Sequence, residues 1–328
     1  MEQVTGIHHV TAIAGDAQEN LDFYTGVMGL RLVKKSVNQD DPTTYHLFYA
    51  DADGHPGTDL TFFPWANMPR GRQGIGLTVE VSLAVPGGSL AYWSERLARH
   101  GVTTGEPETR SGGNALPLTD PHGLALALVE TDAAREFTAW KKSTVPEARQ
   151  IRGLHGVRLW ERDLAATARF LTTAMGFTAR GEADGWYRFG LGGGSGGSGR
   201  GVASGSGRML EIRELPDTQR GMWGVGSVHH VAWRVPDDSA QLAVRQQVEE
   251  AGRRPTEVID RFWFRSVYFM EPGGALFEVA TDGPGFTVDE NPAALGERLI
   301  LPPWLEQRRP EIEGVLAPLR APAEVGLD

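Results

Sequence analysis

Short stretches of alternating apolar and polar residues recur along the chain, and at four places such a stretch is followed by a helical pattern. The four begin near residues 6, 74, 153 and 226. Alternation is typical of a strand with one buried face, whereas apolar residues at every third or fourth position indicate a helix. Turn signals such as "ADADGHPG" and "RSGGN" then separate further strands. We therefore predict four modules, each with one strand, one helix and several more strands.

The predicted helices follow the first strand of each module. In residues 16–30, "DAQENLDFYTGVMGL", Asp16 and Glu19 have capping-box spacing and Gly29 supplies a stop signal. The other helices are predicted for residues 88–101, 163–177 and 237–252. The chain is thus predicted to be an α+β protein of four βαβββ modules, at about 6–66, 74–132, 153–215 and 226–282. Its length fits two domains, which we place at residues 1–150 and 151–328.

Two adjacent histidines lie in the first strand of both the first and the fourth module. They are His8 and His9 in "GIHHVTAIAG", and His229 and His230 in "GSVHHVAWRV". Neighbouring side chains of a strand point to opposite faces, so one histidine of each pair is expected to face a given pocket. The repeat indicates that modules one and four carry related residues.

The other two modules lack these residues at the positions that we align with them. Gly76 and Gly156 stand where the second histidine of a pair would lie, and Ala127 aligns with Glu278 of "GALFEVATD". We therefore expect ligand-like residues only in modules one and four, which must then lie side by side around one cup. Modules two and three are expected to form a second cup with a structural or subunit-contact role.

His9, His230 and Glu278 are the residues that we assign to a metal site. Glu278 interrupts an apolar strand, and a carboxylate buried there is costly unless a cation accompanies it. Two imidazoles and one carboxylate on one face form the triad that suits non-haem Fe(II) and leaves positions open for substrate and O₂. Zn(II) and Mn(II) accept the same donors.

Composition and charge narrow the range of partners. Hydrophobic residues make up 40% of the 328 residues and charged residues 23%, near the soluble average, and no apolar run is long enough to span a bilayer. The chain has no cysteine, which excludes disulfides and thiolate ligands. A net charge of −10 argues against nucleic acid or an anionic membrane as partner. Because the N-terminus has no signal-peptide pattern, we expect a cytoplasmic protein.

Several long motifs carry a resemblance to a known family. They are "FYTGVMGLRLVKKSVNQDDPTTYHLFYAD", "GHPGTDLTFFPW", "RFWFRSVYFMEPGGALFEVATDGPGF" and "LGERLILPPWLEQRRPEIEGVL". Over about residues 5–318 the chain resembles the hydroquinone-cleaving extradiol dioxygenases of the vicinal-oxygen-chelate, or glyoxalase-like, superfamily. The resemblance implies four modules in two cupped sheets, Fe(II) on His9, His230 and Glu278, a small dihydroxylated aromatic substrate with O₂, and a homo-oligomer. Mn(II) is the alternative metal.

The resemblance also implies five residues around the ligands. Tyr268, Arg261 and His229 would be catalytic, and Thr11 and His8 would lie beside the ligands or the substrate. A cationic arginine and a phenol there could stabilise a substrate oxyanion or pass protons. Thr11 shares strand parity with His9, whereas ideal alternation turns His229 away from His230. An active-site position for His229 therefore needs a twist or a bulge in the strand.

Two other functions stay open from the sequence. A glyoxalase-like isomerase or lyase would typically keep a second glutamate in the last strand of module one, where "DLTFFPW" offers only Asp59. A binding or resistance protein of the same fold would hold a small aromatic or drug without turnover. The Gly/Ser-rich residues 190–208 have the composition of a linker, with a lid as the functional alternative.

Overall fold

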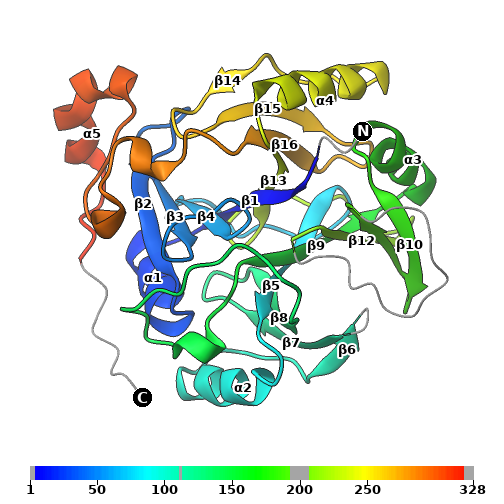
Figure 1. The fold of residues 1–328 in the computed structure, drawn as a ribbon, viewed down its shortest axis with the longest axis horizontal. Helices are drawn as coiled ribbons and strands as arrows, with labels where there is room; N and C mark the ends of the chain where they lie inside the picture. The colour runs from blue at the N-terminus through cyan, green and yellow to red at the C-terminus, as the bar shows by residue number, and fades with distance from the viewer. Residues whose placement is uncertain (1–3, 111–112, 193–206, 321–328) are drawn as a thin grey trace.

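The computed structural model describes residues 4–110, 113–192 and 207–320 and arranges them as two curved sheets of eight strands each (Figure 1). Module one holds β1 (Gly6–Ala14), α1 (Ala17–Leu21), the π-helical η1 (Asp22–Val27), β2 (Arg31–Val37), β3 (Tyr45–Ala50) and β4 (Asp59–Pro64). Module two holds β5 (Leu77–Val85), α2 (Leu90–Arg99), β6 (Glu108–Arg110), β7 (Gly113–Thr119) and β8 (Ala125–Glu130).

The second half of the chain repeats this order. Module three holds β9 (Leu154–Glu161), α3 (Leu164–Ala174), β10 (Thr178–Ala183), β11 (Trp186–Gly190) and β12 (Met209–Glu214). Module four holds β13 (Val228–Val235), α4 (Asp238–Glu250), β14 (Ile259–Asp260), β15 (Arg265–Met270) and β16 (Leu276–Thr281). A short 3₁₀-helix, η5 (Pro303–Arg308), leads into α5 (Arg309–Val315). The predicted α+β fold of four βαβββ modules is confirmed.

Each sheet joins one module from each half of the chain. One sheet has the order β14-β15-β16-β13-β1-β4-β3-β2 and therefore pairs modules one and four, as expected. The other, β10-β11-β12-β9-β5-β8-β7-β6, pairs modules two and three. In both, the two first strands pair antiparallel at the centre, and each first strand runs parallel to the last strand of its own module. The division into domains at residue 150 stays a prediction.

Aspartate caps begin three of the predicted helices. Asp16, Asp163 and Asp237 each accept a hydrogen bond from the backbone N–H three residues later, at 2.8 to 3.1 Å. The first helix differs from its prediction, because its α-helical part ends at Leu21 and the chain continues as a π-helix to Val27. The Thr25 hydroxyl donates to the Leu21 carbonyl at 2.6 Å, and such a bond competes with regular helix pairing.

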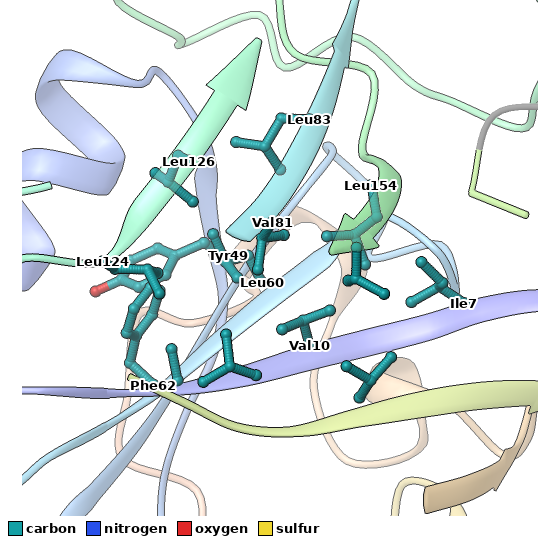
Figure 2. Close-up of a cluster of buried hydrophobic side chains, with 14 of the residues drawn as sticks. Ile7, Val10, Tyr49, Leu60, Phe62, Val81, Leu83, Leu124, Leu126 and Leu154 are labelled. Atoms are coloured by element: carbon teal, nitrogen blue, oxygen red, sulfur yellow. The ribbon is translucent and has the colours of Figure 1, made fainter. Parts of the chain in front are cut away.

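A β-bulge in each of the two central strands explains why adjacent histidines occur there. The pairing of β1 with β13 shifts by one residue at His8 and again at His229, so each of these residues is the extra one in its strand. The shift places Ile7 and Val10, three residues apart, in the same buried cluster (Figure 2). His9 is left to face the opposite side of the sheet, inside the cup.

The buried cluster joins the two sheets. Figure 2 shows Val10 of β1 and Leu60 of β4 beside Val81 of β5 and Leu154 of β9, all less than 1% exposed. These apolar side chains come from both sheets, which therefore pack on each other through one face. The opposite face of the first sheet forms the cup that holds the candidate site. Among the described residues, no helix combines the length and the apolar character that crossing a membrane requires.

The second cup corrects one alignment made from the sequence. Its central strands carry the same two bulges, and their register places Glu80, not Gly76, at the position of His9. The expected match of Gly156 to His230 agrees with this register. The error arose because the bulge in module two lies at Val79, five residues after the predicted start of the module, and the position of a bulge cannot be read from alternation alone.

Polar residues are therefore present in modules two and three as well. The register of β9 with β12 places Glu211 at the position of Glu278. Arg158 lies between the two acids, with its Nε 2.7 Å from Glu211 Oε2 and 3.8 Å from Glu80 Oε1. In the second cup a guanidinium thus accompanies the carboxylates. Of the Gly/Ser-rich segment predicted at 190–208, residues 193–206 lie outside the described residues.

Candidate metal centre

Three side chains from three strands of the first sheet converge inside its cup. His9 Nε2 of β1 lies 3.2 Å from His230 Nε2 of β13. Glu278 Oε2 of β16 lies 3.4 Å from the first nitrogen and 3.1 Å from the second. These are the residues predicted as metal ligands, and they form the one cluster of three or more such donors in residues 4–110, 113–192 and 207–320.

The donors fit a divalent cation. Glu278 is fully buried, its Oε1 accepts a 2.5 Å hydrogen bond from the Ser266 hydroxyl, and its Oε2 has no hydrogen-bond donor. Burial alone raises the pKa of this carboxyl, but His9 and His230 outweigh burial and hold the pKa well below its usual range. A buried carboxylate oxygen without a donor, facing two imidazole nitrogens, is chemically matched by a metal ion.

The first histidine of each pair lies behind the second one. His8 Nδ1 is 2.9 Å from His9 Nδ1, and His229 Nδ1 is 2.8 Å from His230 Nδ1. Burial and the neighbouring histidine lower the pKa of both His8 and His229 to about 3. The two rings are therefore neutral at pH 7 and can each accept a hydrogen bond.

This arrangement selects a tautomer. A histidine that binds a metal through Nε2 keeps its proton on Nδ1 and donates a hydrogen bond from it to a second group, and His8 and His229 are placed to accept that hydrogen bond from His9 and His230. His229 is also stacked on Trp223, with ring centroids 4.9 Å apart. Neither His8 nor His229 lines the cavity described below. The catalytic role of His229 stays a prediction, and its contacts support a positioning role.

A small cavity opens to solvent above the ligand cluster, and the space inside it together with the solvent at its mouth is about 370 Å³. Aromatic side chains make up much of its wall, namely Phe48, Phe63, Trp263 and Phe264. Asn38, Gln39, Asp40 and Arg261 form a polar rim, in which Asp40 is the exposed member. The cavity therefore offers a flat apolar molecule an aromatic enclosure between the metal donors and a charged opening.

Arg261 and Tyr268, both predicted from the resemblance, line this cavity. The guanidinium carbon of Arg261 lies 5.4 Å from the centre of the Tyr268 ring, and that ring is 5.7 Å from His230. Burial and the charge of Glu278 raise the pKa of Tyr268, so its phenol is protonated at pH 7. Burial lowers the pKa of Arg261, but Tyr268 and Asp40 outweigh it and raise the pKa. The site thus presents one hydrogen-bond donor and one fixed cation.

Thr11 belongs to a buried chain of hydrogen bonds that also contains a histidine missed from the sequence. Its Oγ1 is 2.7 Å from Thr61 Oγ1, which is 2.9 Å from His46 Nε2. His46 lines the cavity, whereas Thr11 does not. Burial, together with His9 and His230, keeps the pKa of His46 well below its usual value. The alternation of "YHLFYA" places His46 on the cup face with Phe48, a signal that could have identified it.

The last strand of module one supplies no second carboxylate to the ligand cluster. Its residue at the position of Glu278 is Thr61, as the registers of β1 with β4 and of β13 with β16 show. Asp59, the carboxylate noted in the sequence, is buried and lies two residues before Thr61, beside His9. Burial and the charge of Asp51 raise its pKa well above the ordinary value. The cluster therefore has three protein donors.

Comparison with known proteins places the chain among related sequences. The family model described as the Glyoxalase/Bleomycin resistance protein/Dioxygenase superfamily matches residues 6–128 and 153–279. MhqA of Bacillus subtilis (strain 168), provisionally named a ring-cleaving dioxygenase, is 41% identical over 97% of this chain and 100% of its own. A chlorohydroquinone/hydroquinone 1,2-dioxygenase of Sphingobium indicum is 33% identical over 95% of each chain.

Solved structures support the same fold. A crystal structure of a provisionally named dioxygenase from Bacillus subtilis subsp. subtilis str. 168 has a TM-score of 0.88 and 39% identity, covering 98% of this chain and 99% of that one. Glyoxalase I from Zea mays has a TM-score of 0.61 at 16% identity, covering 84% of this chain and 92% of its own. This likeness shows a shared fold and nothing about activity.

Proposed function

Because the chain belongs to the Glyoxalase/Bleomycin resistance protein/Dioxygenase superfamily, we propose that it is an Fe(II)-dependent dioxygenase that cleaves the ring of a hydroquinone-type aromatic with O₂. The observation that carries the proposal is the cluster of His9, His230 and Glu278, with three protein donors, at the base of an aromatic cavity. The name of the Sphingobium relative, a hydroquinone 1,2-dioxygenase, supports this substrate class.

His9, His230 and Glu278 would hold the metal, and three donors leave coordination positions for small molecules. When bound there, Fe(II) would supply a redox-active Lewis acid for a phenolic oxygen and for O₂. Mn(II) accepts the same donors and is the alternative metal. The neutral rings of His8 and His229 would keep both ligand imidazoles in the tautomer that metal binding requires.

The side chains of the cavity bind and orient the aromatic ring in this proposal. Phe48, Phe63 and Phe264 would contact its faces and edges and exclude water. The cation of Arg261 favours a deprotonated phenolic oxygen over the neutral phenol, and the Tyr268 hydroxyl can donate to an oxygen of the substrate. His46, neutral at pH 7 and linked to Thr61, can accept a hydrogen bond from a hydroxyl group of the substrate.

Oxygen uptake by anaerobically purified, Fe(II)-reconstituted protein tests the proposal. Methylhydroquinone and catechol are presented in parallel, and the ring-opened product is followed by absorbance. We expect oxygen uptake with the hydroquinone. A chelator should abolish this uptake, and the Glu278→Gln variant should not show it. No uptake with either compound, with one metal tightly bound per chain, would favour an isomerase or lyase, and no bound metal would favour a binding protein. A homo-oligomer, expected from the resemblance, is tested by light scattering in solution.

A further inference from the structure

An ion pair between modules one and four spans the opening of the cavity. Asp40, in the loop between β2 and β3, accepts hydrogen bonds from Arg261, in the connection between β14 and β15. The distances are 3.1 Å from Nη1 to Oδ1 and 2.8 Å from Nη2 to Oδ2. Both carboxylate oxygens and both terminal nitrogens take part, which fixes the plane of the guanidinium as well as its position.

The two partners differ in their exposure to solvent. The side chain of Asp40 is 73% exposed, whereas that of Arg261 is 14% exposed. The carboxylate therefore lies at the surface and holds the guanidinium from outside. The neighbouring Gln39 adds a second contact, because its Nε2 donates to the Arg261 carbonyl oxygen at 2.9 Å. Two consecutive residues of module one thus hold the backbone and the head group of Arg261.

The inner side of the guanidinium faces the candidate site. Its carbon lies 5.4 Å from the centre of the Tyr268 ring, and Arg261 lines the cavity together with His9 and His230. A guanidinium has five N–H donors, of which the two in contact with Asp40 are occupied. The other donors lie on the side of Tyr268, which interacts with the guanidinium, and of the cavity, where an oxygen atom of a bound molecule can accept a hydrogen bond from them. Without Asp40, a long arginine side chain at the rim has the freedom to turn toward solvent.

We propose that Asp40 is a positioning residue that keeps the Arg261 guanidinium directed at an oxygen atom of the aromatic substrate. The inference rests on the proposed function and adds a residue of the opposite module to it. Asp40 acts through Arg261 and contributes little to folding, because an ion pair with one exposed partner stabilises a fold only weakly. The two modules are thereby coupled at the opening as well as at the ligand cluster.

A second arginine of module four provides a matched control. Arg265 Nη1 lies 2.5 Å from Asp238 Oδ2, and both side chains are about half exposed, at 49% and 57%. This pair is absent from the lining of the cavity. Like Asp40→Asn, Asp238→Asn removes one negative charge and the carboxylate partner of an arginine of module four. Unlike Asp40, Asp238 is not part of the candidate site.

The test compares Asp40→Asn, Arg261→Gln, the double variant and Asp238→Asn. Anaerobic calorimetry measures the affinity of each Fe(II)-loaded protein for 4-methoxyphenol, and steady-state assays measure KM and kcat for methylhydroquinone. We expect Asp40→Asn to weaken binding of the phenol and raise KM about tenfold, the ratio that one lost charge-assisted contact produces. Arg261→Gln should reduce the affinity for the phenol by at least the same factor. The double variant should have the same affinity as Arg261→Gln, because Asp40 acts through Arg261. Asp238→Asn should match the wild type within about twofold.

Further readouts separate positioning from folding and from the proposed reaction. The melting temperature of Asp40→Asn should equal that of Asp238→Asn, and Asp40→Glu, which keeps a carboxylate, should recover part of the affinity. Wild-type affinity in Asp40→Asn, or losses that multiply in the double variant, would overturn the positioning role. If the wild type binds the phenol with these differences but cleaves no ring, the proposed reaction fails and the positioning role stands. Absence of any binding of the phenol to the wild type overturns both.

Discussion

Thr61 and Glu278 occupy equivalent positions on the two sides of the cup, one with a hydroxyl and the other with a carboxylate. Thr61 lies beside Thr11 in the register of β1 with β4, and Glu278 lies beside Ala232 in that of β13 with β16. Each contacts a polar residue of the adjacent strand. His46 Nε2 is 2.9 Å from Thr61 Oγ1, and the Ser266 hydroxyl donates to Glu278 at 2.5 Å. Because position 61 has no carboxylate, the cluster of candidate donors consists of His9, His230 and Glu278.

A glutamate at position 61, equivalent to Glu278, should change both metal affinity and oxygen uptake. In Thr61→Glu a second carboxylate enters the ligand cluster, so we expect divalent cations to bind at least about tenfold tighter. Oxygen uptake should fall, because a fourth protein donor occupies a position that small molecules would use. Competition with a metal indicator measures the affinity. Thr61→Gln, of the same size and without charge, is the control, and equal affinity in both variants would contradict the equivalence of the two positions.

Removal of one ligand tests the assigned donors directly. Glu278→Gln keeps the shape of the side chain but removes the charge that faces His9 and His230. We expect metal content after anaerobic reconstitution, measured by elemental analysis, to fall from one per chain to near zero, and oxygen uptake to disappear. His9→Ala and His230→Ala should behave alike. Bound iron together with turnover in any one of the three variants would be incompatible with the assignment.

The histidines behind the ligands should affect metal affinity more than folding. His229→Ala and His8→Ala each remove the ring whose Nδ1 lies 2.8 or 2.9 Å, respectively, from the Nδ1 of a candidate ligand. We expect each to weaken metal binding by about 10- to 100-fold, as is typical for such supporting groups. Chelator competition gives the affinity and circular dichroism the folded fraction. Trp223→Leu, which removes only the ring stacked on His229, should have a smaller effect.

A buried acid pair away from the cavity should make stability depend on pH. Glu161 of β9 is fully buried, and its carboxyl lies close to the buried carboxyl of Glu271. Burial and Glu271 raise the pKa of Glu161 to about 9, against about 4.3 in an unfolded chain. Between these values the folded state keeps a proton that the unfolded state has released. Stability therefore falls as pH rises, by about 1.4 kcal/mol per unit.

Glu161→Gln removes this dependence. The variant should be more stable than the wild type at pH 8, and the difference should shrink toward pH 5. Urea unfolding at intervals from pH 5 to 8.5 measures it, with Glu95→Gln on the exposed face of α2 as the control. A stability difference that is the same at every pH would show that the raised pKa of Glu161 is not its cause.

The arginine of the second cup should be structural. Arg158→Ala removes the guanidinium between Glu80 and Glu211, whose side chains are 14% and 12% exposed, while Arg110 stays paired with Glu80. We expect a loss of about 3 kcal/mol in the free energy of unfolding, as for other broken pairs with little exposure. Denaturant unfolding measures it. Metal content and oxygen uptake should be retained, since the second cup lies in the other sheet, and loss of iron in this variant would contradict that separation.

Local patterns along the chain determined the four modules, their helices and the three candidate ligands. Alternation and helix caps depend on residues that are close in sequence, so they can be recognised without tertiary contacts. Asp16 caps its helix as predicted, and Glu278 stands out because it interrupts an apolar strand. The repeat of the histidine pair was enough to place modules one and four side by side.

Tertiary structure alone decided which side chains meet around these ligands. The bulges at His8 and His229 arise from the pairing of β1 with β13, whose residues are more than 200 positions apart, and they let adjacent histidines contact each other. The long-range register of β5 with β9 likewise showed that the residue equivalent to His9 in the second cup is Glu80 and not Gly76. Asp40 lies in a loop without a periodic sequence pattern, so its contact with Arg261 could not be predicted from the sequence. Register and loop placement depend on contacts between distant segments, and those contacts exist only once the chain is folded.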